Sequence, residues 1–175
     1  SDMKSSLVMS ARTKVEQEPN YSFVTARILL DELRSEALSF LGIAEESSHP
    51  EMKEYYPKAF KAYIDKGIEL EMLDPDLKTF DLTKLGEAID YDRDYQFTYL
   101  GLQTLYDRYF IHFQDTRFEL PQIFFMRVAM GLASEEENKE DRAIEFYRLL
   151  SSFDYMSSTP TLFNSGTLRP QLSSC

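Results

Sequence analysis

The only cysteine of the chain, Cys175, is its last residue and follows a stretch rich in hydroxyl side chains. A cysteine thiolate can act as a nucleophile, a metal ligand or a redox group. Hydroxyl groups such as those of Thr159 and Ser174 can hydrogen-bond to the oxygen atoms of a substrate. A single cysteine cannot form a disulfide within its own chain or build a cysteine-based zinc site. Its residue type and position alone do not distinguish a functional thiol from an inert one.

Two patterns resemble metal sites. Glu46 and His49 have the Glu-x-x-His spacing of di-iron carboxylate bundles, but they lie in an expected loop and no second copy is present. Asp90, Asp92 and Asp94 have the spacing of the first EF-hand ligands, yet a tyrosine follows at the sixth position, where that loop requires glycine. We interpret the three aspartates as an acidic first turn of a helix, where the macrodipole favours negative charge, and we expect no metal site.

The charge balance limits the classes of partner. The chain has 30 acidic residues against 19 Lys and Arg, a formal net charge of −11, and so repels a phosphate backbone at long range. Its six glycines are scattered and lack the spacing of a Rossmann or P-loop phosphate site. We therefore expect neither nucleic-acid binding nor a self-contained nucleotide-binding fold.

The composition is that of a globular domain with a core: 43% of the residues are hydrophobic and 14% are aromatic. The longest apolar runs are only a few residues, whereas a membrane-spanning helix needs roughly 20. No secretion signal is recognisable at the start of the chain. With a single cysteine, these features favour a chain that works in a reducing cytoplasm.

Helical periodicity dominates the chain. Apolar residues recur at helical spacing, and capping residues, Pro and Gly mark the ends of helices at about 20–41, 50–66, 81–89, 94–106 and 121–133, and of one that includes 143–153. A shorter helix is expected before Pro19 and another after Pro75. Gly67 is expected to end the second long helix, and Leu100 to face the core. Alternation between 109 and 120 predicts a small β-hairpin. We expect an all-α domain with one small β element.

From 157 onward the chain is rich in small, hydroxyl-bearing and turn residues, and no helix is predicted there. A tail with so little apolar surface is expected to dock on another molecule or to remain mobile.

The tail carries a specific resemblance. Its residues 159–175 read TPTLFNSGTLRPQLSSC, which is very similar to the segment of class I ribonucleotide reductase large subunits that enters a ten-stranded α/β barrel. The stretches 92–95 and 120–132 also resemble the helical N-terminal domain of that family. The resemblance implies three parts: 1–45, the end of an ATP-cone or its connector; 46–156, the helical domain; and 157–175, the start of the catalytic barrel.

The resemblance also implies a chemistry. These subunits reduce ribonucleoside diphosphates to 2′-deoxyribonucleoside diphosphates by thiyl radical chemistry, for DNA precursor synthesis. Matched to the family motif, Cys175 is the first active-site cysteine, one of a redox-active pair whose partner lies outside this chain. Thr159 and Ser174 match positions that contact the substrate.

The partners implied are the remainder of the large subunit, a second large subunit in a homodimer, the radical-generating small subunit with its metal, and thioredoxin or glutaredoxin. ATP and deoxynucleoside triphosphates would act as allosteric ligands of the whole enzyme. This N-terminal piece is expected to bind no cofactor itself.

Since the radical cysteine and the second redox cysteine are not among these residues, the chain is expected to be inactive alone. It could be an isolated domain or one piece of a split or intein-interrupted gene. The alternative function is a non-catalytic helical interaction module, whose tail complements another chain by adding strands to it.

Overall fold

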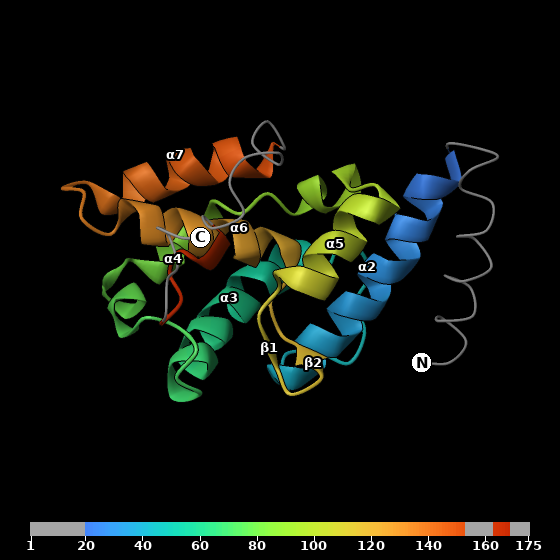
Figure 1. Ribbon diagram of the computed structural model, residues 1–175, viewed down its shortest axis with the longest axis horizontal. Coiled ribbons are helices and arrows are strands. Elements are labelled where there is room, and N and C mark those ends of the chain that lie inside the picture. Colours follow the sequence, from blue (N-terminus) through green and yellow to red (C-terminus); the bar gives the residue numbers. More distant parts are fainter. Residues whose placement is uncertain (1–19, 153–162, 169–175) are drawn as a thin grey trace. The chain divides into compact units, whose positions relative to one another are not determined.

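The computed structural model describes residues 20–152 and 163–168. The chain forms two compact units, each built from two separate stretches. Unit 1 comprises 1–49 and 92–120, and unit 2 comprises 50–91 and 121–175. Figure 1 shows the elements of both units along the chain. The expected division at 45 and 156 remains a prediction.

Unit 1 consists of helix α2 (Asn20–Phe40), the 3-10 turn η2 (Tyr91–Gln96), helix α5 (Tyr99–Arg108) and a hairpin of strands β1 (His112–Phe113) and β2 (Thr116–Arg117). Helix α5 packs along α2 (Figure 1), and β2 lies against the C-terminal part of α2. There the ring of Phe40 stacks on that of Phe118, with 5.0 Å between their centroids. The hairpin is therefore held by the helix.

A partly buried carboxylate joins these elements. Glu36 on α2 accepts hydrogen bonds from the Tyr106 hydroxyl (2.8 Å) and from the backbone N–H of Arg117 (2.9 Å). Burial, and then the hydrogen bond and charge of Glu36, raise the pKa of Tyr106 well above its ordinary range. The tyrosine therefore acts as a hydrogen-bond donor at any physiological pH.

A buried ion pair holds η2 against α2 in unit 1. The guanidinium of Arg34 on α2 binds the carboxylate of Asp94 at 2.9 Å, and both side chains are almost completely buried. Such a pair is tolerated in an interior because each ion offsets the desolvation of the other. It fixes η2 on α2.

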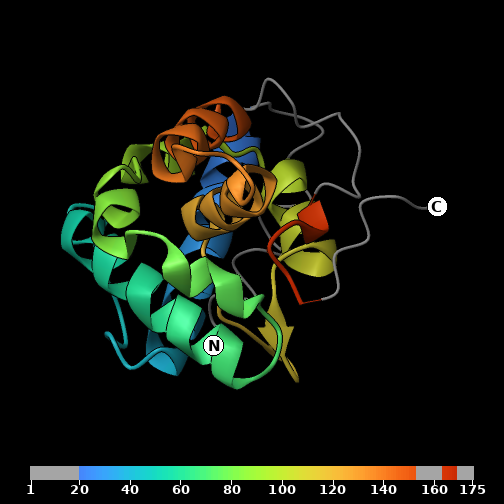
Figure 2. The same ribbon diagram turned by 90° about the vertical axis from the view of Figure 1, so that its left-hand side faces the viewer.

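Unit 2 contains α3 (Met52–Glu69), η1 (Pro75–Thr79), α4 (Leu82–Glu87), α6 (Pro121–Ala133) and α7 (Lys139–Ser151). Helices α6 and α7 lie side by side in both views (Figures 1 and 2). Every residue of α6 from Pro121 to Met130 is buried. This helix is the centre of the core of unit 2.

A polar network ties α6 to its neighbours. The Tyr147 hydroxyl on α7 donates to Gln122 Oε1 at 2.7 Å and accepts from the N–H of Asp90 at 3.0 Å. The N–H of Gln122 donates to the hydroxyl of Tyr56 on α3 at 3.2 Å. The first turn of α6 is thus connected to both flanking helices by hydrogen bonds.

The predominantly helical fold and the small hairpin are confirmed, and α6 has the predicted ends. Two predictions are wrong. Gly67 lies inside α3, where a Cβ would overlap the side chain of Leu73, and the helix ends beyond it with Glu71 in the left-handed conformation (φ 59°). Leu100 is 69% exposed, because Thr98 caps α5 and the helix begins later than its apolar spacing suggested. The helix expected before Pro19 lies outside the described residues.

Among the residues described, no helix is both long enough and apolar enough to cross a membrane.

Breaking the buried ion pair is expected to destabilise the protein. Asp94→Asn leaves the Arg34 cation buried without its carboxylate, which typically costs about 3–5 kcal/mol. Urea denaturation measures the loss. The control is Glu54→Gln, which breaks the exposed Glu54–Lys58 pair on α3 and should leave the free energy of unfolding unchanged. Equal losses for both variants would contradict this account.

The Tyr147 hydroxyl is expected to stabilise unit 2. Tyr147→Phe leaves Gln122 Oε1 and the Asp90 N–H without this partner, at a cost of about 1–3 kcal/mol. Tyr55→Phe removes a hydroxyl on the exposed side of α3, 3.4 Å from Glu51, and serves as the matched control. A Tyr147→Phe protein that unfolds at the wild-type urea concentration would refute the importance of the network.

Candidate functional site

The three residues that the sequence assigns to a site, Thr159, Ser174 and Cys175, lie outside the described residues. Their roles therefore remain predictions. The chain between them is described over residues 163–168, which belong to unit 2. The contacts of this short stretch, called here the 163–168 segment, define what the structure says about the candidate site.

Helix α6 holds the segment through two side chains, Arg127 and Phe124. Arg127 is completely buried, and its Nη1 donates hydrogen bonds to the backbone carbonyl oxygens of Phe163 and Ser165, the latter at 3.0 Å. The guanidinium also lies 5.1 Å from the ring centroid of Phe124, which packs edge-on against the ring of Phe163 at 5.2 Å. A charged donor and an aromatic pair thus fix the start of the segment on α6.

Two glycines permit this close approach. A Cβ on Gly131, one turn along α6 from Arg127, would overlap the Oγ of Ser165 and the N of Gly166. Gly166 has a φ of 82°, and a Cβ there would lie 2.7 Å from the carbonyl oxygen of Arg127. The backbones of α6 and the segment are therefore in direct contact, which only glycine allows at both positions.

The opposite side of the segment pairs with the connection between α3 and η1. The N–H of Asp74 donates to the carbonyl of Gly166, and the N–H of Leu168 donates to that of Met72, both at 3.1 Å. Leu73 and Thr167 form an isolated antiparallel bridge. The segment is thus held like an added strand on one side and by a helix on the other.

These contacts correct one expectation. The tail was expected to remain mobile or to be held by another molecule, but its residues 163–168 are held by this chain itself. The physical reason is that the segment is bound through its backbone, so it needs little apolar surface of its own. The rest of the tail lies outside the described residues.

The two metal-like patterns have other uses in the structure. His49 Nε2 donates to Asp92 at 2.9 Å, its Nδ1 accepts from Arg34 at 3.1 Å, and its ring stacks on Tyr95. Since a guanidinium can only donate, Nδ1 of His49 is the acceptor in its contact with Arg34. Asp94 is the buried partner of Arg34. No group of three or more His, Cys, Asp and Glu side chains that could hold a metal occurs in the described part of the chain.

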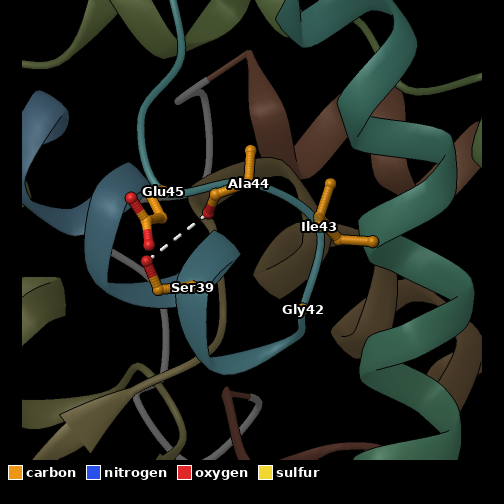
Figure 3. Close-up of a pocket in the computed structure, with 5 residues that line it drawn as sticks. All are labelled: Ser39, Gly42, Ile43, Ala44 and Glu45. Atoms are coloured by element: carbon orange, nitrogen blue, oxygen red, sulfur yellow. Dashed lines mark hydrogen bonds between the residues drawn. The ribbon is translucent and has the colours of Figure 1, made fainter.

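Each unit has a surface hollow. Figure 3 shows one of ≈ 320 Å³ beside the turn that ends α2, lined by Ser39, Gly42, Ile43, Ala44 and Glu45. There Ser39 Oγ donates to the carbonyl of Ala44, and Glu45 is the only ionisable residue. The other, ≈ 430 Å³ in unit 2, lies between the start of α3 and residues 86–91. In the first hollow the Ser39 hydroxyl is bound to a backbone carbonyl, and we assign catalysis to neither hollow.

Sequence reasoning missed Arg127. Its signal was present, because it is the only charged residue between Leu120 and Leu132, in a helix predicted to be mostly apolar. A charge at such a position is buried only when it has hydrogen-bonding partners. The sequence could not show that these partners are backbone carbonyls about 40 residues further along the chain.

A known protein family matches the part of the chain that contains these contacts. Residues 95–170 match the family described as "Ribonucleotide reductase, all-alpha domain". The match includes α5, the hairpin, α6, α7 and the 163–168 segment.

Relatives extend the similarity to nearly the whole chain. The subunit alpha of ribonucleoside-diphosphate reductase from Chlamydia trachomatis is 50% identical over 169 residues, 96% of this chain and 16% of the relative. The Helicobacter pylori subunit is 39% identical over 99% of this chain and 21% of the relative, and the Danio rerio large subunit is 35% identical over 95% and 20%. The chain spans about a fifth or less of the relatives it matches. By these matches, the chain is similar over nearly its whole length to the N-terminal part of ribonucleotide reductase large subunits.

Proposed function

We propose that this chain is the N-terminal part of the large subunit of a ribonucleoside-diphosphate reductase, which converts ribonucleoside diphosphates to their 2′-deoxy forms. The observation that carries the proposal is the similarity to reductase large subunits over nearly the whole chain. The 163–168 segment supports it, because the residues proposed to act in the reaction lie on either side of an anchored stretch of backbone.

Cys175 has the central role in this proposal. Its thiol and that of a second cysteine outside this chain supply two electrons and two protons, the ribose 2′-hydroxyl leaves as water, and the two sulfurs end as a disulfide. The small subunit supplies the metal-generated radical that starts the reaction. Thr159 and Ser174 would hold substrate oxygens through their hydroxyl or backbone donors.

The remaining assignments follow from the same proposal. The chain would act with the rest of the large subunit in a homodimer, with the small subunit, and with thioredoxin or glutaredoxin to reduce the disulfide. ATP and deoxynucleoside triphosphates would regulate the whole enzyme, in the cytoplasm, for DNA precursor synthesis. The single cysteine and the excess of acidic residues support a reducing compartment and no nucleic-acid partner.

Replacing Cys175 tests the redox role. In the full-length large subunit with its small subunit and reductant, Cys175→Ser should abolish repeated turnover, because serine is similar in size but cannot form a disulfide. The measurement is deoxynucleotide formed per active site. The chain has no second cysteine to serve as a control, so unchanged substrate affinity by calorimetry is the internal control. Full turnover by this variant would remove the redox assignment.

Replacing Thr159 tests substrate binding. Thr159→Val deletes one hydroxyl that would bond to a charged phosphate, which should cost about 1.5–3 kcal/mol and weaken substrate binding about ten- to a hundredfold. The matched control is Thr104→Val, since Thr104 bonds to the Leu100 carbonyl within α5. If both variants bind substrate with the same affinity as wild type, Thr159 does not contact it.

A further inference from the structure

We propose that Arg127 is a positioning residue of this enzyme, which fixes the backbone of the 163–168 segment and through it the placement of Thr159 and Cys175. The inference rests on the proposed function, in which those two residues meet the substrate. Arg127 itself touches neither substrate nor reacting atoms in this account. It acts through the chain that it binds.

The hydrogen bonds of Arg127 select one conformation of the segment. A single nitrogen, Nη1, donates to the carbonyls of Phe163 and Ser165, two residues apart. Both carbonyls must point at the same atom, so a rotation of either peptide plane breaks a bond. Hydrogen bonds from a cation are stronger than neutral ones, and burial excludes competing water.

The segment is recognised by its backbone on every side that the structure describes. Besides the two carbonyls bound by Arg127, the Gly166 carbonyl and the Leu168 N–H are bound by residues 74 and 72. In contrast, the buried Oγ of Ser165 has no hydrogen-bond partner among the described atoms. These backbone contacts fix where the main chain runs and in which register, and the packing of Phe163 against Phe124 adds to them.

An apolar side chain at position 127 could fill the same space. Burying a charged group is costly, and apolar residues of similar size often serve stability equally well or better. Arg127 provides what Leu or Met cannot, namely donors that reach two carbonyls of a distant segment. This favours a role in placing that segment over a role in filling the core alone.

The anchor is close to the proposed active-site residues along the chain. Phe163 is four positions after Thr159, so even a fully extended chain spans at most about 14 Å between them. Cys175 is ten positions after Ser165, so the chain between them spans at most about 35 Å. A misplacement of about 1 Å can slow an enzyme about 100-fold. Loss of the Arg127 hydrogen bonds is therefore expected to lower the rate of the reaction.

The test uses the full-length large subunit with its small subunit. Arg127→Met keeps the volume but removes the donors. It should lower kcat about 10- to 100-fold, which is more than its loss of folded protein explains. Arg127→Lys, which keeps a cationic donor, should recover a measurable part of the lost kcat. Gly131→Ala should reproduce the defect with Arg127 intact, because its Cβ displaces Ser165 and Gly166. The double variant Arg127→Met/Gly131→Ala should lower kcat by less than the product of the two single fold-changes.

Two controls separate positioning from general damage. Arg142→Met removes an exposed arginine on α7 and should leave kcat and Tm unchanged. Amide hydrogen exchange at Asp74 and Leu168 should accelerate in Arg127→Met, because the Asp74 N–H donates to Gly166 of the segment and the Leu168 N–H of the segment donates to Met72. This readout does not depend on activity.

The outcomes are distinct. A wild-type enzyme that forms no deoxynucleotide contradicts the proposed function, whatever the exchange data show. An active wild type whose Arg127→Met variant keeps kcat within about twofold overturns the positioning role alone. If every loss of kcat in the Arg127 and Gly131 variants matches a loss of folded protein by circular dichroism, Arg127 is a structural residue and the inference is wrong.

Discussion

The burial of helix α6 on all sides is the constraint on which unit 2 depends. From Pro121 to Met130 no residue of this helix reaches solvent. Any polar side chain on it must therefore find its partners inside the unit. Gln122 finds one in Tyr147, and Arg127 finds two in the carbonyls of Phe163 and Ser165. The elements that supply those partners have little freedom to move without leaving a polar group buried and unpaired.

The same constraint explains the position of the glycines. A helix that is covered on every side can accept a backbone segment only where its own side chain is absent, and Gly131 provides that gap on α6. Gly67 on α3 leaves room instead for the side chain of Leu73. The backbone of Leu73 in turn pairs with Thr167. A glycine inside a helix, usually a weak point, is here a contact surface.

Much of this fold could be predicted from the sequence, and the exceptions have identifiable causes. The ends of α6 were predictable because Pro121 begins the helix and its apolar run is continuous. The end of α3 was not, since Gly67 is required by a tertiary contact and the helix continues past it to a terminus formed by Glu71. Leu100 was misplaced because apolar spacing was extended backwards past the cap at Thr98. Local signals locate an element, but packing partners decide its ends and its buried face.

The candidate site, too, could be predicted only in part from the sequence. Thr159, Ser174 and Cys175 could be identified only from resemblance, because a lone thiol and scattered hydroxyls have no spacing that specifies a chemistry. Arg127 could be noticed as a charge in an apolar helix, but its partners are separated from it by 36 and 38 residues. A backbone carbonyl has no signature in the sequence, since every residue carries one. The main-chain contacts that hold such a segment are therefore invisible to motif analysis, even when the segment belongs to the motif itself.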